Sequence, residues 1–322
     1  MLRAVRFCLM LEGQEGVTWA QWLAVAETAE RLGFDALFTS DHYLSVQGSR
    51  ERGSSDAWTM LAGLAARTST IRLGTMVSPV TFRAPAVLAK AATTVDHLSG
   101  GRVELGMGAG WWEEEHRTHG FPFPAVRERF DRLEEQLEIV HGLMTQERFS
   151  FQGKHYRLDD APFWPKPIQE PHIPVILGGT TVGPLMQRLI GRWADEFNTV
   201  SGTPEKVGAR FVRAREGARA AGRDDGSLTT SFMTWCYVGR TEDEWLGRVH
   251  LARERAMRAG KFEDELTELE PDTILGTPDR AAAKLREYEA AGVQRVVLNH
   301  ELFDDLDMLD VIATEIVPRV NG

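Results

Sequence analysis

The sequence predicts a (β/α)8 barrel, and three observations support this fold class. Eight short apolar runs typical of β-strands alternate with longer amphipathic runs typical of α-helices. The strand-like runs are apolar on both faces, so they are expected to pair in parallel with helices covering both sides of the sheet. A chain of 322 residues also falls in the size range of one barrel. A doubly wound open sheet is the alternative.

The predicted elements follow one another along the chain. The expected strands span residues 3–10, 35–40, 71–77, 102–107, 173–178, 196–200, 229–238 and 294–299. Four helix starts carry sequence signals: a capping-box spacing at Thr18/Gln21 and at Thr241/Glu244, and a threonine before a proline at 203–204 and at 277–278. The helix expected at residues 125–146 has apolar side chains at three- and four-residue steps, so one of its faces should be buried.

Two segments interrupt this alternation. Residues 147–172 are rich in proline and aromatic residues, and residues 261–277 are rich in acidic residues. No flexible linker divides the chain into halves. We therefore expect one domain, residues 1–322, with insertions near 147–172 and 261–277.

Composition and charge exclude several classes of partner. The formal net charge of -10 argues against nucleic acid, because phosphate binding requires a clustered basic surface. The apolar run in the first residues is too short to span a membrane, so a cytoplasmic protein without a membrane partner is expected. Cys8 and Cys236 lie in strand-like runs and are expected to be reduced core thiols. His116 and His119 lack the further ligands of a barrel metal site, so we interpret them as solvated loop histidines and expect no metal.

Candidate functional residues follow the second and fifth strands, because functional side chains of a (β/α)8 barrel gather at the C-terminal strand ends. Asp41-His42 offers an anion and a titratable imidazole for cofactor binding and proton transfer. An aspartate that caps the loop beside a packed histidine is equally consistent with the residues alone. Gly178-Gly179, followed by two threonines, has amides and hydroxyls suited to a phosphate, with a tight turn as the alternative.

The fourth predicted strand and the loop that follows it have the sequence RVELGMGAGWWEEEH, residues 102–116. This stretch lacks the glycine spacing of a dinucleotide fingerprint, which also belongs in a first βα unit. Glycines at every second position allow either close approach of a flat ligand to bare backbone or tight packing of the chain. Trp111 and Trp112 are candidate walls for such a ligand, with core filling as the alternative. Like charges raise each other's pKa, so at most one or two of the adjacent carboxylates should point inward, with Glu113 and Glu115 expected at the helix start or in water.

Five segments resemble the luciferase-like monooxygenase superfamily, and within it the branch that uses the deazaflavin coenzyme F420. They are LGFDALFTSDHY, the block from residue 71 to 123 that contains GMGAGWWEEEH and HGFPF, and the shorter PVILGG, WADEFN and GTPDRAAAKLREYEAAGVQRVVL. The resemblance covers nearly the whole chain and implies a (β/α)8 barrel with insertions. It also implies hydride transfer between F420 and a small organic substrate.

The resemblance assigns roles to residues at the strand ends. The implied cofactor-binding residues are Asp41 at the polar edge of the ring, Met76 and Val77 behind it, Ala109 and Gly110 as bare backbone beside it, and Gly178, Gly179, Thr180 and Ser201 around the phosphate-bearing tail. The Met76-Val77 peptide is expected to be cis although it contains no proline. His42 is implied as the catalytic proton donor or acceptor, and Glu114 occupies a cofactor-facing place in related loops.

Departures from the pattern leave the substrate open. Sugar-phosphate dehydrogenases of this branch have a tryptophan and a glutamate where this chain has Val46 and Trp111, so a sugar phosphate is not expected. The alternative function is an FMN-dependent monooxygenase served by a partner reductase. The oligoglutamate tail of F420 would require basic residues at the barrel mouth, and Arg83 and Lys206 are candidates. A non-catalytic barrel is a second alternative, a metal-dependent hydrolase lacks ligands, and a homodimer is expected.

Overall fold

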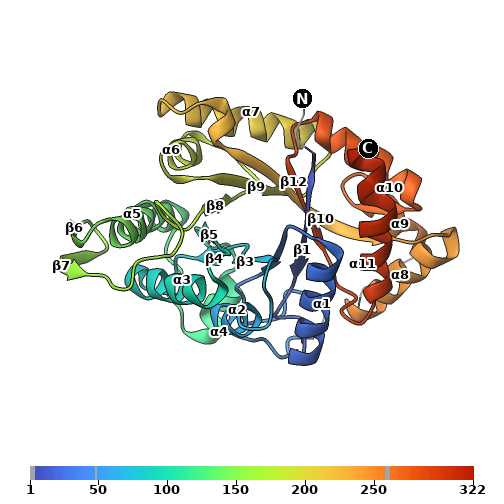
Figure 1. The fold of residues 1–322 in the computed structure, drawn as a ribbon, viewed down its shortest axis with the longest axis horizontal. Helices are drawn as coiled ribbons and strands as arrows, with labels where there is room; N and C mark the ends of the chain where they lie inside the picture. The colour runs from blue at the N-terminus through green and yellow to red at the C-terminus, as the bar shows by residue number, and fades with distance from the viewer. Residues whose placement is uncertain (1–3, 48, 258–261) are drawn as a thin grey trace.

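Eight parallel strands close into a barrel in the computed structural model, which describes residues 4–47, 49–257 and 262–322 (Figure 1). Their order around the barrel is β1, β2, β3, β5, β8, β9, β10 and β12, and β12 pairs with β1 again. The strands are β1 (Arg6–Leu11), β2 (Ala36–Thr39), β3 (Arg72–Thr75), β5 (Val103–Gly108), β8 (Val175–Gly178), β9 (Glu196–Val200), β10 (Thr229–Val238) and β12 (Arg295–Asn299). The predicted barrel is confirmed, and the pairings that close it exclude the open sheet.

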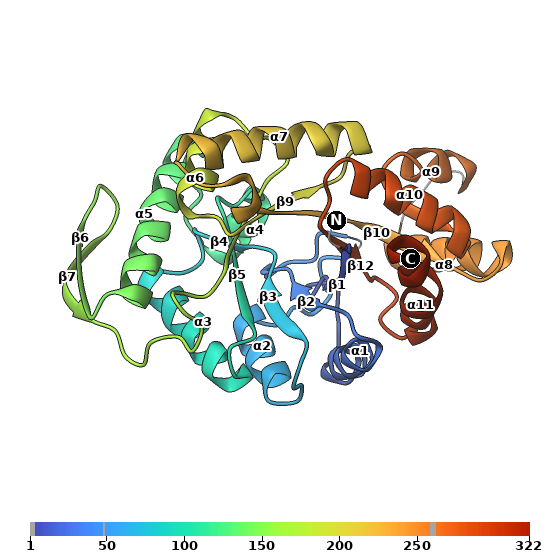
Figure 2. The same cartoon turned by 45° about the horizontal axis from the view of Figure 1, so that its top comes forward.

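Helices surround the barrel in both views of the ribbon (Figure 2). They are α1 (Trp19–Leu32), α2 (Ala57–Ala65), α3 (Pro85–Ser99), α4 (Glu113–His119), α5 (Val126–Thr145), α6 (Pro184–Trp193), α7 (Pro204–Ala220), α8 (Glu242–Arg255), α9 (Phe262–Leu269), α10 (Pro278–Ala290), α11 (Leu306–Val311) and α12 (Val317–Asn321). A short 3-10 turn (Asp225–Ser227) precedes β10, and a π-helical turn (Ile312–Ile316) joins α11 to α12. Within the described residues, no helix has the length and apolar character needed to cross a membrane.

The two segments expected as insertions form structure of their own. In the first, β6 (Arg148–Gln152) and β7 (Arg157–Pro162) make an antiparallel hairpin that projects beyond α5 at one end of the molecule (Figures 1 and 2). The second, apart from residue 261, which lies outside the described residues, contains α9 and β11 (Ile274–Gly276), and β11 pairs in parallel with β10. A further short strand, β4 (Ser78–Pro79), pairs with β5. The single-domain organisation stays a prediction.

The helix starts agree with their sequence signals. Thr18 and Gln21 form both hydrogen bonds of a capping box before α1. Before α8 the hydroxyl of Thr241 accepts from the amide of Glu244, as expected, but the Glu244 carboxylate accepts from the amide of Arg240. The threonines at 203 and 277 occupy N-cap positions, and each is followed by a proline that favours the helical φ, but neither side chain accepts a capping hydrogen bond.

Paired charges fill the barrel at the N-terminal ends of its strands. The Arg295 guanidinium, at the start of β12, lies 2.7 Å from a carboxylate oxygen of Glu104, 2.6 Å from one of Glu196 and 2.8 Å from one of Asp35. Cys8 and Cys236 are buried and free, as predicted. Among the described residues there is no group of three or more side chains suited to hold a metal ion.

Candidate active site

A cavity of about 700 Å³ opens at the C-terminal ends of the barrel strands. This position and size are usual for the ligand site of a (β/α)8 enzyme. The C-terminal ends of β2, β3, β5 and β8 and the loops after them supply residues expected from the sequence: Asp41, His42, Met76, Val77, Ala109, Gly110, Trp111, Trp112, Gly178, Gly179 and Thr180 all line it, as does Val200 at the end of β9. The topology therefore brings together most of the predicted site residues.

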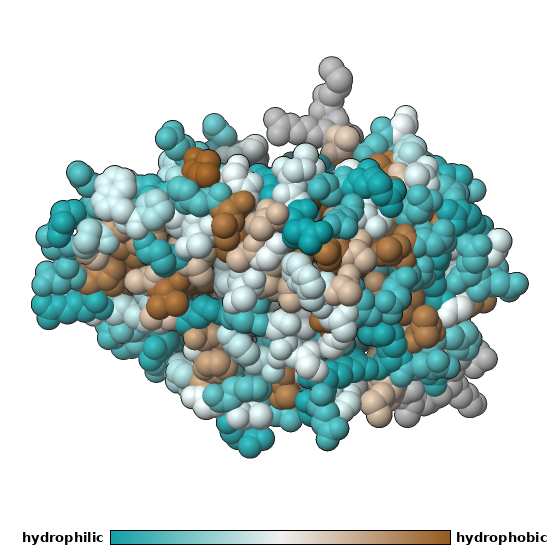
Figure 3. Space-filling view, turned by 60° about the horizontal axis from the view of Figure 1, so that its bottom comes forward, coloured by the Kyte–Doolittle hydropathy of each residue, from teal (hydrophilic) through white to brown (hydrophobic). Residues whose placement is uncertain are grey.

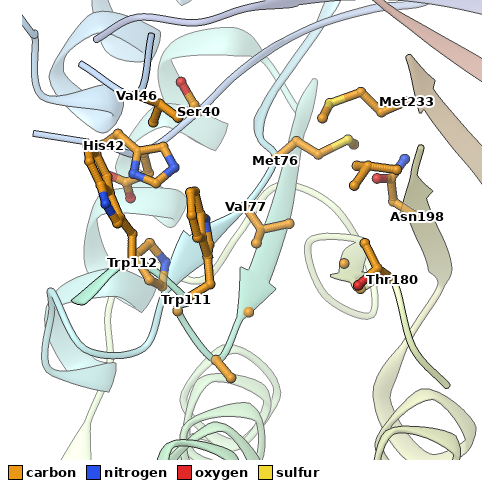
Figure 4. Close-up of a pocket in the computed structure, with 18 of the residues that line it drawn as sticks. Ser40, His42, Val46, Met76, Val77, Trp111, Trp112, Thr180, Asn198 and Met233 are labelled. Atoms are coloured by element: carbon orange, nitrogen blue, oxygen red, sulfur yellow. The ribbon is translucent and has the colours of Figure 1, made fainter. Parts of the chain in front are cut away.

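The Met76-Val77 peptide forms a bulge in the middle of this cavity, and it is cis, as predicted. A Cβ atom on Gly108 would lie 2.6 Å from Cγ2 of Val77, and one on Gly178 would lie 3.1 Å from its Cγ1. At Gly106 a Cβ would meet the backbone of Thr75. The strand-end glycines therefore make room for the bulge, so tight packing of the chain explains Gly106 and Gly108. The exposed side of Val77 is left to face a ligand (Figure 4).

His42 is held by a buried carboxylate. Its Nδ1 lies 2.8 Å from Oε2 of Glu115, whose other oxygen accepts from the amides of Tyr43 and Leu44 at 2.6 and 3.2 Å. Burial lowers the pKa of His42, but the hydrogen bond and the charge of Glu115 outweigh burial, with Glu12 and Asp41 adding to the effect, and the pKa is raised. The imidazole is thus oriented and favoured in its protonated form.

The structure corrects the expectation for the three adjacent glutamates. Glu115 is fully buried and reaches His42, whereas the Glu114 side chain is 43% exposed and pairs with Arg50 at 2.9 Å. Glu114 does not line the cavity, and Glu113 is exposed as expected. The reason is helical geometry: α4 begins at Glu113, and successive helical residues point about 100° apart, so the third glutamate faces the barrel.

Asp41 belongs to a buried polar network. Its Oδ2 accepts from the Ser78 hydroxyl at 2.6 Å and from the Arg83 guanidinium at 2.5 Å. Arg83 also donates to Asp56 and to the Tyr43 hydroxyl. Arg83 is therefore committed to fixing the loop after β2, and the expectation that it serves a long anionic tail at the barrel mouth is wrong. The other candidate cation, Lys206, is exposed in the first turn of α7.

Trp111 and Trp112 form an aromatic wall beside His42. Their rings stack with an interplanar angle of 15° and a centroid separation of 5.8 Å. The His42 ring stands nearly perpendicular to both, with centroids 5.9 and 6.0 Å away. Arg50 lies over the Trp112 ring at 4.7 Å and so supports the wall from outside. Figure 4 shows His42, Val46 and both tryptophans on one side of Val77.

The opposite side of Val77 holds Thr180 and Asn198 (Figure 4). Here the turn after β8 leads into the N-terminus of α6, and the Gly179 amide donates to the Asn198 carbonyl at 3.0 Å. A helix start with preceding glycines and threonines is suited to an anion. Ser201, predicted to contact the tail, follows the lining residue Val200 but does not line the cavity in the described structure.

His116 and Arg129 are among the lining residues that were not expected from the sequence. His116, interpreted there as solvated, is buried: its Nδ1 lies 2.7 Å from the Trp112 carbonyl and its Nε2 2.6 Å from the Thr81 hydroxyl. Burial lowers its pKa and so favours the neutral imidazole, whereas His119 is exposed as predicted. Arg129 is buried on α5, and its guanidinium lies 3.9 Å from the Phe123 ring centroid, while its Nε has no hydrogen-bond partner.

The cavity fits a flat ring that carries an anionic chain. The Val77 bulge and the backbone of Ala109 offer an apolar surface to one face of a ring. One end of the cavity has the oriented imidazole, which can exchange a proton, and the other has the start of α6. A buried guanidinium with an unpartnered Nε suits a negative charge. The described residues thus separate a reaction end from an anion end.

Comparison with known proteins agrees with this arrangement. The family model described as luciferase-like monooxygenase matches residues 5–295. The chain is 31% identical to F420-dependent glucose-6-phosphate dehydrogenase from Intrasporangium calvum, over 91% of this chain and 92% of that protein. Coenzyme F420-dependent tetrahydromethanopterin reductase from Methanopyrus kandleri has a similar fold, with a TM-score of 0.81, 22% identity and coverage of 99% of this chain and 100% of the other. Monooxygenase RslO1 from Streptomyces bottropensis does too, with a TM-score of 0.83, 24% identity and coverage of 98% and 99%. The chain therefore belongs to the luciferase-like monooxygenase family.

Proposed function

We propose that this protein is an oxidoreductase that uses coenzyme F420 to transfer a hydride to or from a small organic substrate. The observation that carries the proposal is one cavity in which a bulge backs a flat ring, His42 is oriented by Glu115, and a helix start receives an anion. The 31% identity to a protein named for its dependence on F420 supports this cofactor. When bound, F420 would supply the hydride donor or acceptor.

The residues of the chain would orient the ring and move one proton. Val77 and Ala109 would lie against one face of the ring, and Asp41 would meet its polar edge. The Nδ1 of His42 is committed to Glu115, so proton exchange with the substrate would take place at Nε2. Glu115, and not Glu114 as expected, is the glutamate of this site. Its role would be to position the His42 imidazole.

The turn from Gly178 to Thr180 and the start of α6 would hold the phosphate-bearing tail. Arg129 also lines the cavity, and we assign its buried guanidinium to the same tail because its Nε has no hydrogen-bond partner and suits a negative charge. Ser201 stays a prediction as a tail contact. Lys206 is exposed near the same end of β9 and is the basic residue available to a longer anionic chain.

An FMN-dependent monooxygenase with a partner reductase is the second candidate. It is favoured by the similar fold of monooxygenase RslO1, although this likeness is at 24% identity and concerns the fold alone. A homodimer and a cytoplasmic location also stay predictions. Exposed apolar residues such as Val87 and Leu98 on α3 suit a protein interface. On the face seen in Figure 3, apolar side chains form small separate groups among hydrophilic ones.

A titration of the purified protein with F420, oxidised FMN and reduced FMN, followed by tryptophan fluorescence, tests the cofactor. Trp111 and Trp112 line the cavity and should report a ring that binds beside them. The expected result is micromolar binding of F420 with much weaker binding of both forms of FMN. Tighter binding of reduced FMN would indicate that the protein is an FMN-dependent monooxygenase. Binding of none of the three would favour a barrel without catalytic activity.

A further inference from the structure

The reaction end of the cavity has an aromatic wall. Val46, Trp111 and Trp112 lie beside His42 (Figure 4), and Trp235 also lines the cavity. Trp111 is 62% exposed and stacks on its neighbour. An indole face left open to solvent beside a cavity is a surface on which a planar molecule gains contact, because stacked aromatic pairs are favourable beyond their buried area.

Three acidic side chains lie near His42 at this end. Glu12, Asp41 and Glu115 line the cavity, and Arg129, assigned to the tail, is the sole arginine or lysine among the described lining residues. Asp41 is paired with Arg83 and Glu115 with His42. The two cations are therefore already paired with carboxylates and are not free for an incoming anion. Burial raises the pKa of Glu12, which reflects how poorly this region solvates a negative charge. A phosphate or carboxylate in this region would likewise be poorly solvated.

Resting on the proposed function, we infer that the substrate is a planar, uncharged molecule with a carbonyl conjugated to a carbon–carbon double bond, stacked on Trp111. In the reaction the C=C π bond breaks. With reduced F420 bound, the β-carbon would receive a hydride and its two electrons, while Nε2 of His42 would give a proton to the α-carbon. The products are the saturated carbonyl compound and the oxidised deazaflavin, whose released ring proton balances the proton that His42 gives up.

The direction of reaction follows from the state of His42. A histidine held by a buried carboxylate is favoured as imidazolium, and an imidazolium is a proton donor. Reduction of a conjugated carbonyl requires such a donor, and no second acid is needed. The perpendicular contact of the His42 ring with both indoles keeps the donor at the edge of a molecule stacked there.

Calorimetric titration with three matched probes tests the inference. The probes are benzylideneacetone, cinnamate and glucose 6-phosphate, added to the protein saturated with oxidised F420, so that binding is measured without turnover. Benzylideneacetone and cinnamate have the same planar skeleton and differ in charge. We expect benzylideneacetone to bind at least tenfold more tightly than either anion.

Three variants locate the binding surface. Trp111→Ala should weaken benzylideneacetone binding about tenfold, with Trp111→Phe close to the wild type, since an aromatic face is retained. Trp164→Ala is the matched control, because Trp164 is 61% exposed and does not line the cavity, and it should bind like the wild type.

Equal or tighter binding of cinnamate or glucose 6-phosphate would overturn the inference, as would a change of less than twofold in Trp111→Ala. Failure of the proposed function has a separate signature, which is the absence of F420 binding in the preceding titration. In that case the same probes are added to the free protein, where the preference for the uncharged probe and the loss in Trp111→Ala still decide whether the surface is selective.

Discussion

The two ends of the barrel are built from the same strands but differ in what fills them: buried ion pairs at one end and an open cavity at the other. At the N-terminal end Arg295 is 2% exposed and meets Glu104, Glu196 and Asp35, so buried charges fill the space. At the C-terminal end glycines and a bulge leave a cavity of about 700 Å³ beside His42. Stability and chemistry are therefore separated along the barrel axis, and substitutions at each end should have different consequences.

The largest loss of stability is expected at the closed end. Arg295→Met leaves buried carboxylates without their cation, and loss of one partner of a buried ion pair typically costs about 3–5 kcal/mol. Urea unfolding should show this decrease in the free energy of unfolding. Arg67→Met is the control, since its side chain is 53% exposed and pairs with Glu27 on the surface, where about 1 kcal/mol or less is expected. A loss below about 1 kcal/mol in Arg295→Met would show that these charges do not stabilise the closed end.

An intermediate effect is expected where the bulge meets the strand. Gly108→Ala would place a methyl group 2.6 Å from Cγ2 of Val77 and push the bulge into the cavity. Overpacking of this kind costs about 1–3 kcal/mol, and F420 binding should weaken as well. Gly247→Ala in α8 has open space around the new methyl and should stabilise by about 0.5–1 kcal/mol. Wild-type stability and affinity in Gly108→Ala would refute the role assigned to the bulge.

A smaller effect, limited to protonation, is expected at the dyad. Glu115→Gln removes the charge and the carboxylate hydrogen bond that raise the pKa of His42, so that pKa should fall. NMR titration of the histidine ring protons measures it. Because the folded-state pKa is raised, His42 stabilises the fold below the unfolded pKa of about 6.5 and loses this contribution as pH rises through the folded-state pKa. Glu115→Gln should flatten that loss, and an unchanged His42 titration would contradict the dyad.

The smallest effect is expected for the glutamate next to it. Glu114→Gln disrupts a half-exposed ion pair with Arg50, so stability should change by less than about 0.5 kcal/mol and the His42 titration should not move. Chemical denaturation and the same NMR titration provide the measurement. A shift of the His42 pKa in Glu114→Gln as large as that in Glu115→Gln would mean that α4 is rotated from the orientation described above.

The barrel was predictable because strand and helix periodicity depend on local sequence. All eight barrel strands lie where their apolar runs predicted them, and the cis peptide at Met76-Val77 followed from a family resemblance. The choice among three consecutive glutamates was not predictable, since it depends on the residue at which α4 begins. Arg83 and His116 were misjudged for a related reason, as their partners come from distant loops. The sequence also contains no signal for the hydrogen bonds that two amides of the loop after β2 donate to the Glu115 carboxylate.

The central claim is that F420 binds at the open end of the barrel with its ring between the Val77 bulge and His42. A crystal structure of the protein with oxidised F420 measures this directly. The account predicts a ring stacked on Val77 and Ala109, His42 beside its reactive edge, and the phosphate-bearing tail at the start of α6. A ring bound elsewhere, or a tail directed toward Trp111 and Trp112, would contradict it.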